Sequence, residues 1–249
     1  MAPEYPYALS AHDEASISYR EKDLASEVMG ELGFTETLYY TWTGEMPDAG
    51  ERRVLTAMLN SLMLHGVTPS TLVSRTVLVS EPDAVQAAVA SAINGVGSRL
   101  IGPMKECSED LQRVSAADDR KTAIEQLVEE YATGDDHFPG IGHPHLDPVD
   151  PRAVRLFELA DEADVAGEHV EILEEIRDAI NPDLPINATG AIAALTADMG
   201  LPPAGARGIA IVSRTAGVLA EVLAEQDTPF ASEVWQHVDE HATPGGAQD

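Results

Sequence analysis

Apolar residues recur at helical spacing along most of the chain. The clearest run covers residues 51–64, where Val54, Leu55, Met58, Leu59 and Leu62 fall on one broad face. Comparable spacing covers residues 21–45, with a second run over residues 34–42, and predicts a helix that begins at Pro69. It also predicts helices over residues 84–93, 118–131, 152–163, 167–180, 191–199 and 206–225. No segment has the alternating pattern of a convincing strand. The sequence therefore predicts an all-α fold built from many helices.

The linking segments divide the chain into one long helical region and two loose ends. We expect a multi-helix domain over residues 16–240, either as one body or with a reduced small subdomain. A flexible N-terminus over residues 1–15 and a flexible, glycine-rich tail over residues 241–249 flank this domain. Residues 133–149 contain Gly and Pro clusters without a regular period, which is typical of a long functional loop.

The chain is strongly acidic, with 43 acidic residues against 15 basic ones and a formal net charge of -28. Lys22, Lys105 and Lys121 are its only lysines. Because the acidic residues are spread along the chain, the composition favours a haloarchaeal type of protein. Such a protein stays soluble at molar salt, where the screening length falls to about 3 Å. An ordinary acidic enzyme is the alternative. In either case the sparse basic surface disfavours nucleic acid and anionic membranes as partners.

Other features of the composition exclude several classes of protein. Cys107 is the single cysteine, which excludes a disulfide framework and a cysteine metal cluster. The apolar runs stay below the roughly 18 residues of a membrane span, and the N-terminus lacks the pattern of a secretory leader. We therefore expect a soluble, cytoplasmic protein. Phosphate-loop, dinucleotide-binding and nucleophile-elbow motifs are missing, so ATP hydrolysis, redox and serine-hydrolase chemistry have no support.

Arg214 is the strongest candidate for binding an anion on physical grounds alone. It lies within residues 208–217, a predicted helix with almost no other charge. A guanidinium in such a helix is costly when unpaired, and a carboxylate satisfies it in a bidentate arrangement. That carboxylate belongs either to a substrate or to a buried acidic residue of the protein. A side chain that reaches out to solvent is a third interpretation.

His143 follows a run of glycine and proline, Phe138-Pro139-Gly140-Ile141-Gly142. The two glycines allow the backbone to approach a ligand closely, and a histidine transfers protons near neutral pH. The alternative is an ordinary surface histidine. A metal site formed by His137, His143 and His145 is a further alternative, but their spacing matches no helical or zinc-finger pattern. We therefore predict no metal.

His65 and Arg152 are candidates because of their places in predicted helices. His65 ends an apolar helix, where the helix dipole stabilises a charged imidazole. The helix end either only accommodates this side chain or presents it to a site. Arg152 stands in the first turn of a helix, where the dipole disfavours a cation. It therefore either points at an anion or pairs with Asp150.

Taken together, these segments resemble the citrate synthase superfamily, and within it the short citryl-CoA lyases and the C-terminal module of ATP-citrate lyase. Leu64-His65-Gly66 with Thr68-Pro69-Ser70 is similar to the first histidine segment of that family. Pro139 to His143 with Asp150-Pro151-Arg152 is similar to its second histidine and a citrate-binding arginine. Ser213 to Gly217 is similar to the segment with another such arginine. The resemblance extends over nearly the whole chain.

The resemblance implies an all-helical, usually dimeric enzyme that makes or breaks the carbon–carbon bond of a citryl thioester. His65 and His143 would contact the oxo-acid or hydroxyl oxygen and shuttle its proton, while Arg152, Arg214 and Asn187 would bind the substrate. The coenzyme A adenine would lie against the backbone of Phe138, Pro139, Gly140, Ile141 and Gly142. The coenzyme A thioester would be a substrate, and no tightly bound cofactor is expected.

Two positions depart from the family pattern. Leu100 stands where full citrate synthases carry a further histidine, which favours a lyase over a synthase. Thr189 stands where the family has its catalytic aspartate, and threonine is no base near neutral pH. Three explanations stay open. Asp147 or His145 replaces the aspartate, the substrate differs, or the protein binds an acyl-CoA or a polycarboxylate without turning it over.

The resulting hypothesis is a carbon–carbon lyase that reversibly cleaves citryl-CoA, or a related 3-hydroxy-3-carboxyacyl-CoA, to acetyl-CoA and an oxo acid such as oxaloacetate. His65, His143 and Thr189 are its catalytic candidates. A citrate or 2-methylcitrate synthase and a non-catalytic binding protein are the alternatives. We expect a homodimer or a higher homo-oligomer. Because the chain has no segment that makes citryl-CoA, a citryl-CoA synthetase-type ligase is a candidate partner.

Overall fold

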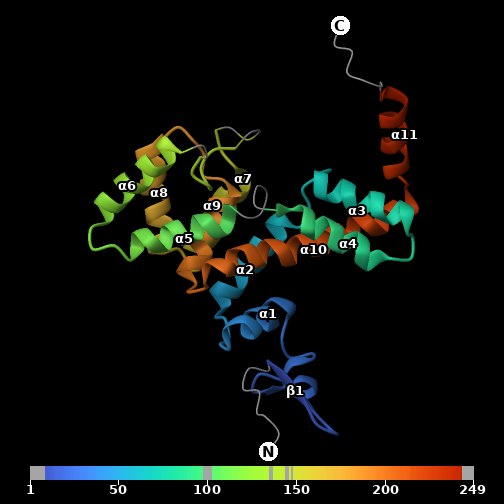
Figure 1. The fold of residues 1–249 in the computed structure, drawn as a ribbon. Coiled ribbons are helices and arrows are strands. Elements are labelled where there is room, and N and C mark those ends of the chain that lie inside the picture. Colours follow the sequence, from blue (N-terminus) through green and yellow to red (C-terminus); the bar gives the residue numbers. More distant parts are fainter. Residues whose placement is uncertain (1–8, 98–102, 135–136, 144–145, 147, 243–249) are drawn as a thin grey trace, which may run out of the picture.

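A long array of helices follows a short N-terminal sheet (Figure 1). The computed structural model describes residues 9–97, 103–134, 137–143, 146 and 148–242. The helices are α1 (Phe34–Thr43), α2 (Ala49–Leu62), α3 (Pro69–Ser80), α4 (Val85–Gly95), α5 (Pro103–Ser115), α6 (Arg120–Thr133), α7 (Pro151–Asp161), α8 (Glu168–Ile180), α9 (Ala188–Asp198), α10 (Pro203–Asp227) and α11 (Ala231–His241). The predicted all-α fold is confirmed. No helix in the described residues is long and apolar enough to cross a membrane.

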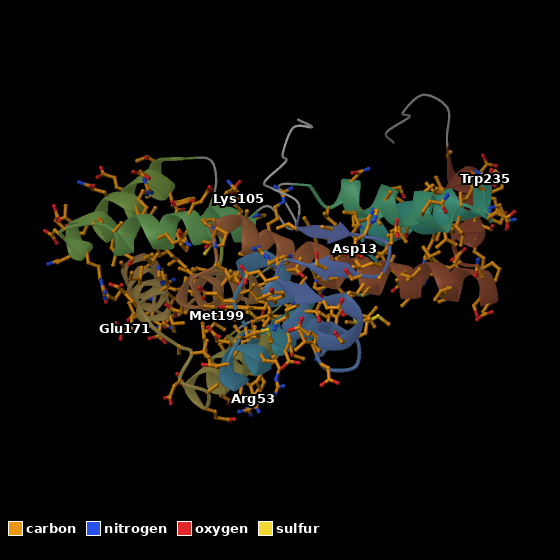
Figure 2. The ribbon with its side chains drawn as sticks, turned by 90° about the horizontal axis from the view of Figure 1, so that it is seen from below. Asp13, Arg53, Lys105, Glu171, Met199 and Trp235 are labelled. Carbon is orange, nitrogen blue, oxygen red and sulfur yellow. The ribbon has the colours of Figure 1, made fainter. Side chains whose placement is uncertain are left out.

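The 25-residue helix α10 connects two groups of helices. Its first half packs against α2, α5 and α9 in a core that contains the fully buried Leu55, Leu111 and Ile209. Its second half packs against α3 and α4 through Val218 and Val222. Glu171 of α8 and Trp235 of α11 lie at opposite ends of this arrangement (Figure 2). Arg214 therefore lies on the helix that both groups share.

Helix α9 is buried along almost its whole length. Many of its residues are alanine or glycine, which are small, so α5, α7 and α8 can all pack closely against it. The pattern of apolar residues predicts this helix from residue 191, whereas the structure begins it at Ala188. The earlier start has a local cause, because the side chain of Asn187 accepts hydrogen bonds from the first turn.

The pattern analysis does not predict α5 or α11. On α5 the buried Met104, Cys107 and Leu111 lie on one face, but polar and charged residues such as Lys105 and Asp110 separate them. Helix α11 depends on a long-range contact. The buried Glu225 carboxylate accepts hydrogen bonds from the first backbone N–H groups of α11 and pairs with Arg75 of α3 at 2.6 Å. Periodicity carries no information about such a contact.

The expectation that the chain has no strand is wrong at the N-terminus. Strands β1 (Ser10–His12), β2 (Ile17–Tyr19) and β3 (Lys22–Asp23) form an antiparallel sheet, and η1 (Leu24–Val28) is a short π-helical turn after it. These strands are two or three residues long and mostly exposed, so they have no apolar alternation to detect. Strand β1 also gives regular structure to part of residues 1–15.

Candidate active site

Histidines, arginines and the start of α9 surround one cavity of about 260 Å³. The contributing helices α7, α9 and α10 meet near the middle of the molecule (Figure 1). The cavity brings together all the residues predicted to be catalytic or substrate-binding, namely His65, His143, Thr189, Arg152, Arg214 and Asn187. The rest of its lining is Leu62, Thr68, Ser70, Val96, Met104, Gly142, Ala188 and Ala210. Residues 98–102, 144–145 and 147 lie outside the described residues, so Leu100, His145 and Asp147 are not placed.

Asn187 fixes the start of α9 and the loop before His143 at the same time. Its Oδ1 accepts hydrogen bonds from the backbone N–H groups of Thr189 at 2.9 Å and Gly190 at 3.2 Å. Its Nδ2 donates to the carbonyl oxygen of Gly142 at 2.7 Å. Because both groups of the Asn187 side chain are used inside the protein, its main task is to position the cavity wall.

Backbone pairing completes the attachment of this loop. The N–H of Asn187 donates to the Gly140 carbonyl at 3.0 Å, and the N–H of Gly142 donates to the Pro185 carbonyl at 2.8 Å. Gly140 has a φ of 106°, and a Cβ added to it would lie 2.7 Å from the Cα of Gly190. Only glycine fits this crossing. His143 therefore follows a backbone that is held in place on two sides.

Arg152 is held by Asp150, the residue that caps α7. The buried carboxylate of Asp150 accepts from Nε of Arg152 at 3.0 Å and from Nη2 at 2.8 Å. It also accepts from the backbone N–H of Ala188 at 3.0 Å, so one carboxylate joins the starts of α7 and α9. Burial raises the pKa of Asp150, but the hydrogen bonds from Arg152 and Ala188 outweigh it and hold the pKa below its ordinary value. The pairing of Arg152 with Asp150 is confirmed, and the side chain also lines the cavity. That it binds an anion stays a prediction.

Replacing Asp150 with asparagine is expected to lower the free energy of unfolding at pH 7 by about 3 kcal/mol, because one partner of a buried ion pair is lost. The folded pKa of Asp150 lies below the unfolded value of about 3.8. Its contribution is therefore complete above the unfolded pKa and disappears as the pH falls through the lower folded pKa. Urea denaturation at pH 7 and at acidic pH should give a difference in the free energy of unfolding between wild type and variant that shrinks on acidification.

The matched control Asp178→Asn removes an exposed ion pair with Arg177 and should change this free energy little. A difference that is constant across this pH range would contradict the assignment.

Arg214 is the second arginine of the site. Ser213, its neighbour on α10, is buried and donates a hydrogen bond to the Leu59 carbonyl of α2, which fixes this part of the helix. Arg214 is partly buried, and within the described ranges no hydrogen bond or ion pair satisfies its guanidinium. Desolvation and the nearby charge of Arg152 lower its pKa. Of the two arginines, Arg152 is paired with Asp150, so Arg214 is the stronger candidate for binding an anion.

The two histidines differ in their surroundings. The backbone N–H of Leu146 donates to Nδ1 of His143 at 3.1 Å, so a neutral His143 ring carries its proton on Nε2. Desolvation by the surrounding protein and the charges of Arg214 and Arg152 lower the pKa of His65. The His65 ring is therefore neutral at neutral pH and has a nitrogen that can accept a proton.

An apolar pocket of about 640 Å³ adjoins the cavity and shares Gly142 and His143 with it. Its walls come from α6, the loop and the segment around Ile180 and Leu184. The rings of Tyr131 and Phe138 meet edge to face, with centroids 5.3 Å apart. Of the residues predicted to hold coenzyme A, Phe138, Ile141 and Gly142 line this pocket, whereas Pro139 and Gly140 line neither cavity.

The sequence matches the family described as citrate synthase, C-terminal domain, over residues 9–231. The chain belongs to the citrate synthase family. No curated protein matches it closely enough to add a relative. The match covers both predicted histidine segments, the start of α9 and Arg214, so the cavity lies within the family domain.

Among solved structures of this family, the chain is similar to citryl-CoA lyase from Hydrogenobacter thermophilus, with 28% identity and a TM-score of 0.84 over 96% of this chain and 94% of that chain. It is also similar to ATP citrate lyase from Methanosaeta concilii in complex with (3S)-citryl-CoA, with 17% identity and a TM-score of 0.79. That match covers 100% of this chain and 43% of the other, so this chain spans less than half of that enzyme. Citrate synthase from Thermotoga maritima has 18% identity and a TM-score of 0.67, over 88% of this chain and 58% of that one. At these lower identities the last two comparisons show a shared fold.

The structure adds residues to this citrate synthase-family site that the sequence analysis did not single out. Tyr131 forms a wall of the apolar pocket, and its hydroxyl donates to Asp110 at 2.7 Å. The sequence gives little indication that Tyr131 lines a pocket, because a tyrosine on a charged, exposed helix can have many roles. For a metal, the described part of the chain has no group of three or more His, Cys, Asp or Glu residues suited to bind one, and His145 is outside it.

Proposed function

We propose that the protein is a citryl-CoA lyase. It cleaves citryl-CoA, or a related 3-hydroxy-3-carboxyacyl-CoA, reversibly to acetyl-CoA and an oxo acid such as oxaloacetate. The observation that carries the proposal is Arg214, a partly buried guanidinium without a partner in the described residues, beside Arg152 and both histidines. The similarity to the Hydrogenobacter thermophilus enzyme over nearly the full length of both chains supports the same activity.

Substrate binding follows from the charges of the cavity. A citryl thioester has two free carboxylates, and Arg214 and Arg152 supply two guanidinium groups in the same cavity. Asp150 keeps Arg152 in one orientation, whereas Arg214 gains its hydrogen bonds only when the substrate is present. The coenzyme A end lies in the apolar pocket beside Phe138 and Tyr131, and the chain uses this thioester as a substrate without a tightly bound cofactor.

The histidines divide the proton transfer between them. His65 is neutral at neutral pH and accepts the proton of the substrate hydroxyl when the carbon–carbon bond breaks. His143 donates from Nε2 to the thioester oxygen, where negative charge develops in the transition state. Both groups face the same cavity as the arginines, so binding the carboxylates also orients the bond that breaks.

A non-catalytic role is the second candidate function, and one observation favours it. No described residue of the cavity lining carries a carboxyl group, and Thr189 offers only a hydroxyl at the start of α9. A protein of this kind would bind an acyl-CoA or a polycarboxylate through the same arginines. A citrate or 2-methylcitrate synthase is less favoured than a lyase, because Leu100 stands where full citrate synthases carry a further histidine.

The assembly and the setting of the protein are part of the proposal. Large apolar side chains are exposed at Leu64 and Val67, next to His65 in the chain, and at Leu223 of α10. Trp235 of α11 is exposed as well (Figure 2). Exposed apolar surface of this kind supports a homodimer or a higher homo-oligomer. The net charge of -28 supports a cytoplasm with molar salt. A separate citryl-CoA synthetase-type ligase would supply the substrate.

The direct test is cleavage of citryl-CoA by the purified protein in about 2–3 M KCl, a concentration chosen for the acidic surface. We expect acetyl-CoA and oxaloacetate to form in equal amounts, and a His65→Ala variant to be far slower. Calorimetric binding of citrate and coenzyme A without any product would instead identify a binding protein. Neither binding nor turnover would reject both candidate functions.

A further inference from the structure

Thr189 has a hydroxyl that the fold does not use. Its side chain is partly exposed in the cavity, and within the described residues no hydrogen bond engages the hydroxyl. Other helical threonines behave differently. Thr196 donates to the carbonyl four residues earlier at 2.5 Å, and Thr215 does so at 2.7 Å. For Thr189 the carbonyl four residues earlier belongs to Pro185, and it accepts from the Gly142 N–H instead. The hydroxyl is therefore available to a molecule in the cavity.

The proposed cleavage needs a proton donor in the cavity. When the carbon–carbon bond of a 3-hydroxyacyl thioester breaks, the electron pair stays on the acyl carbon, which then takes up one proton. Within the described lining no carboxyl group can supply it. Asp150 is buried and its carboxylate is already bonded to Arg152 and Ala188. A hydroxyl such as that of Thr189 both donates and accepts hydrogen bonds, which suits it to hold water.

We propose, on the basis of the proposed lyase function, that Thr189 holds a water molecule that protonates the departing acyl carbon. The water gives one proton to this carbon, which completes the methyl group of acetyl-CoA. The hydroxide that remains takes up the proton that His65 received from the substrate hydroxyl, which restores the water and the neutral histidine. No net proton is gained or lost. Thr189 is thus a positioning residue that acts through water.

The test compares Thr189→Val, which keeps the shape and removes the hydroxyl, with Thr189→Ser, which keeps the hydroxyl. Citryl-CoA with a stereospecific deuterium label in the reacting methylene is cleaved in tritiated water. We expect Thr189→Val to lower kcat by roughly 10- to 100-fold with little change in KM, and Thr189→Ser to stay near wild type. Because a held water approaches from one face, wild type should give a chiral methyl group of one configuration. Thr189→Val should give a mixture.

The stereochemical readout separates water positioning from a structural role, and melting temperature and citrate binding verify that both variants fold. A Thr189→Val variant with wild-type rate and configuration would overturn the proposal. So would loss of turnover in Asp147→Asn with an unaffected Thr189→Val, since proton delivery would then belong to the loop. If wild type is active and Thr189→Val is unaffected, only the proposed water is ruled out. If wild type is inactive, the lyase function is ruled out together with the water.

Discussion

Replacing Arg214 with methionine is expected to lower kcat/KM for citryl-CoA by about 100- to 1,000-fold. The side chain lines the cavity and lacks a partner within the described part of the chain, so the substrate carboxylate supplies its hydrogen bonds. Loss of a bidentate, charge-assisted pair costs about 3–4 kcal/mol, and each 1.4 kcal/mol is about tenfold in an equilibrium or rate ratio. Steady-state kinetics with citryl-CoA measures the effect directly.

The same substitution is expected to stabilise the protein without ligand. Desolvation and Arg152 disfavour the charged form of Arg214, so methionine should raise the free energy of unfolding by about 1 kcal/mol. Citrate should raise the melting temperature of wild type and not that of the variant. Arg155→Met is the matched control, because Arg155 lies on α7 near Arg152 but is exposed and paired with Glu158. Equal losses of activity in the two variants would contradict a specific role of Arg214, as would a less stable Arg214→Met.

Residues of the site could be predicted from the sequence because they differ in chemical type from the residues around them. Arg214 is a charge in an apolar helix, and His143 follows a Gly-Pro run that a packed helix cannot contain. The resemblance to a known family then predicts that segments far apart in the chain contribute to one site. The structure agrees, since these side chains line one cavity within the family domain.

What the sequence does not contain is the set of contacts between distant segments. Asp150 forms hydrogen bonds with both Arg152 and the start of α9, yet in the sequence it is only a capping residue before a helix. Glu225 is one of many acidic residues, although its burial against Arg75 holds α11. The strands over residues 10–23 are too short to produce a period. These features depend on geometry, which a pattern of residue types does not encode.

A pair of substitutions at His143 is expected to separate its structural hydrogen bond from its chemistry. Nδ1 of His143 accepts from the Leu146 N–H, so the neutral ring carries its proton on Nε2, which we propose to act on the thioester oxygen. In His143→Asn the amide oxygen takes the place of Nδ1, so the loop is retained while the donor is lost. We expect kcat to fall by about 10²–10⁴. In His143→Gln the amide reaches the position of Nε2 and offers a donor there, so the loss should be smaller.

The order of these two variants is the decisive result, because both replace the imidazole with an amide. Higher kcat in His143→Gln than in His143→Asn, although only His143→Asn keeps an acceptor for the Leu146 N–H, indicates that the Nε2 proton stabilises charge on the thioester oxygen. The acidic limb of the pH profile should remain in both variants, since it belongs to His65, whose pKa is lowered by desolvation and by the two arginines. If the limb disappears in both, His143 is the base, and the roles of the two histidines must be exchanged.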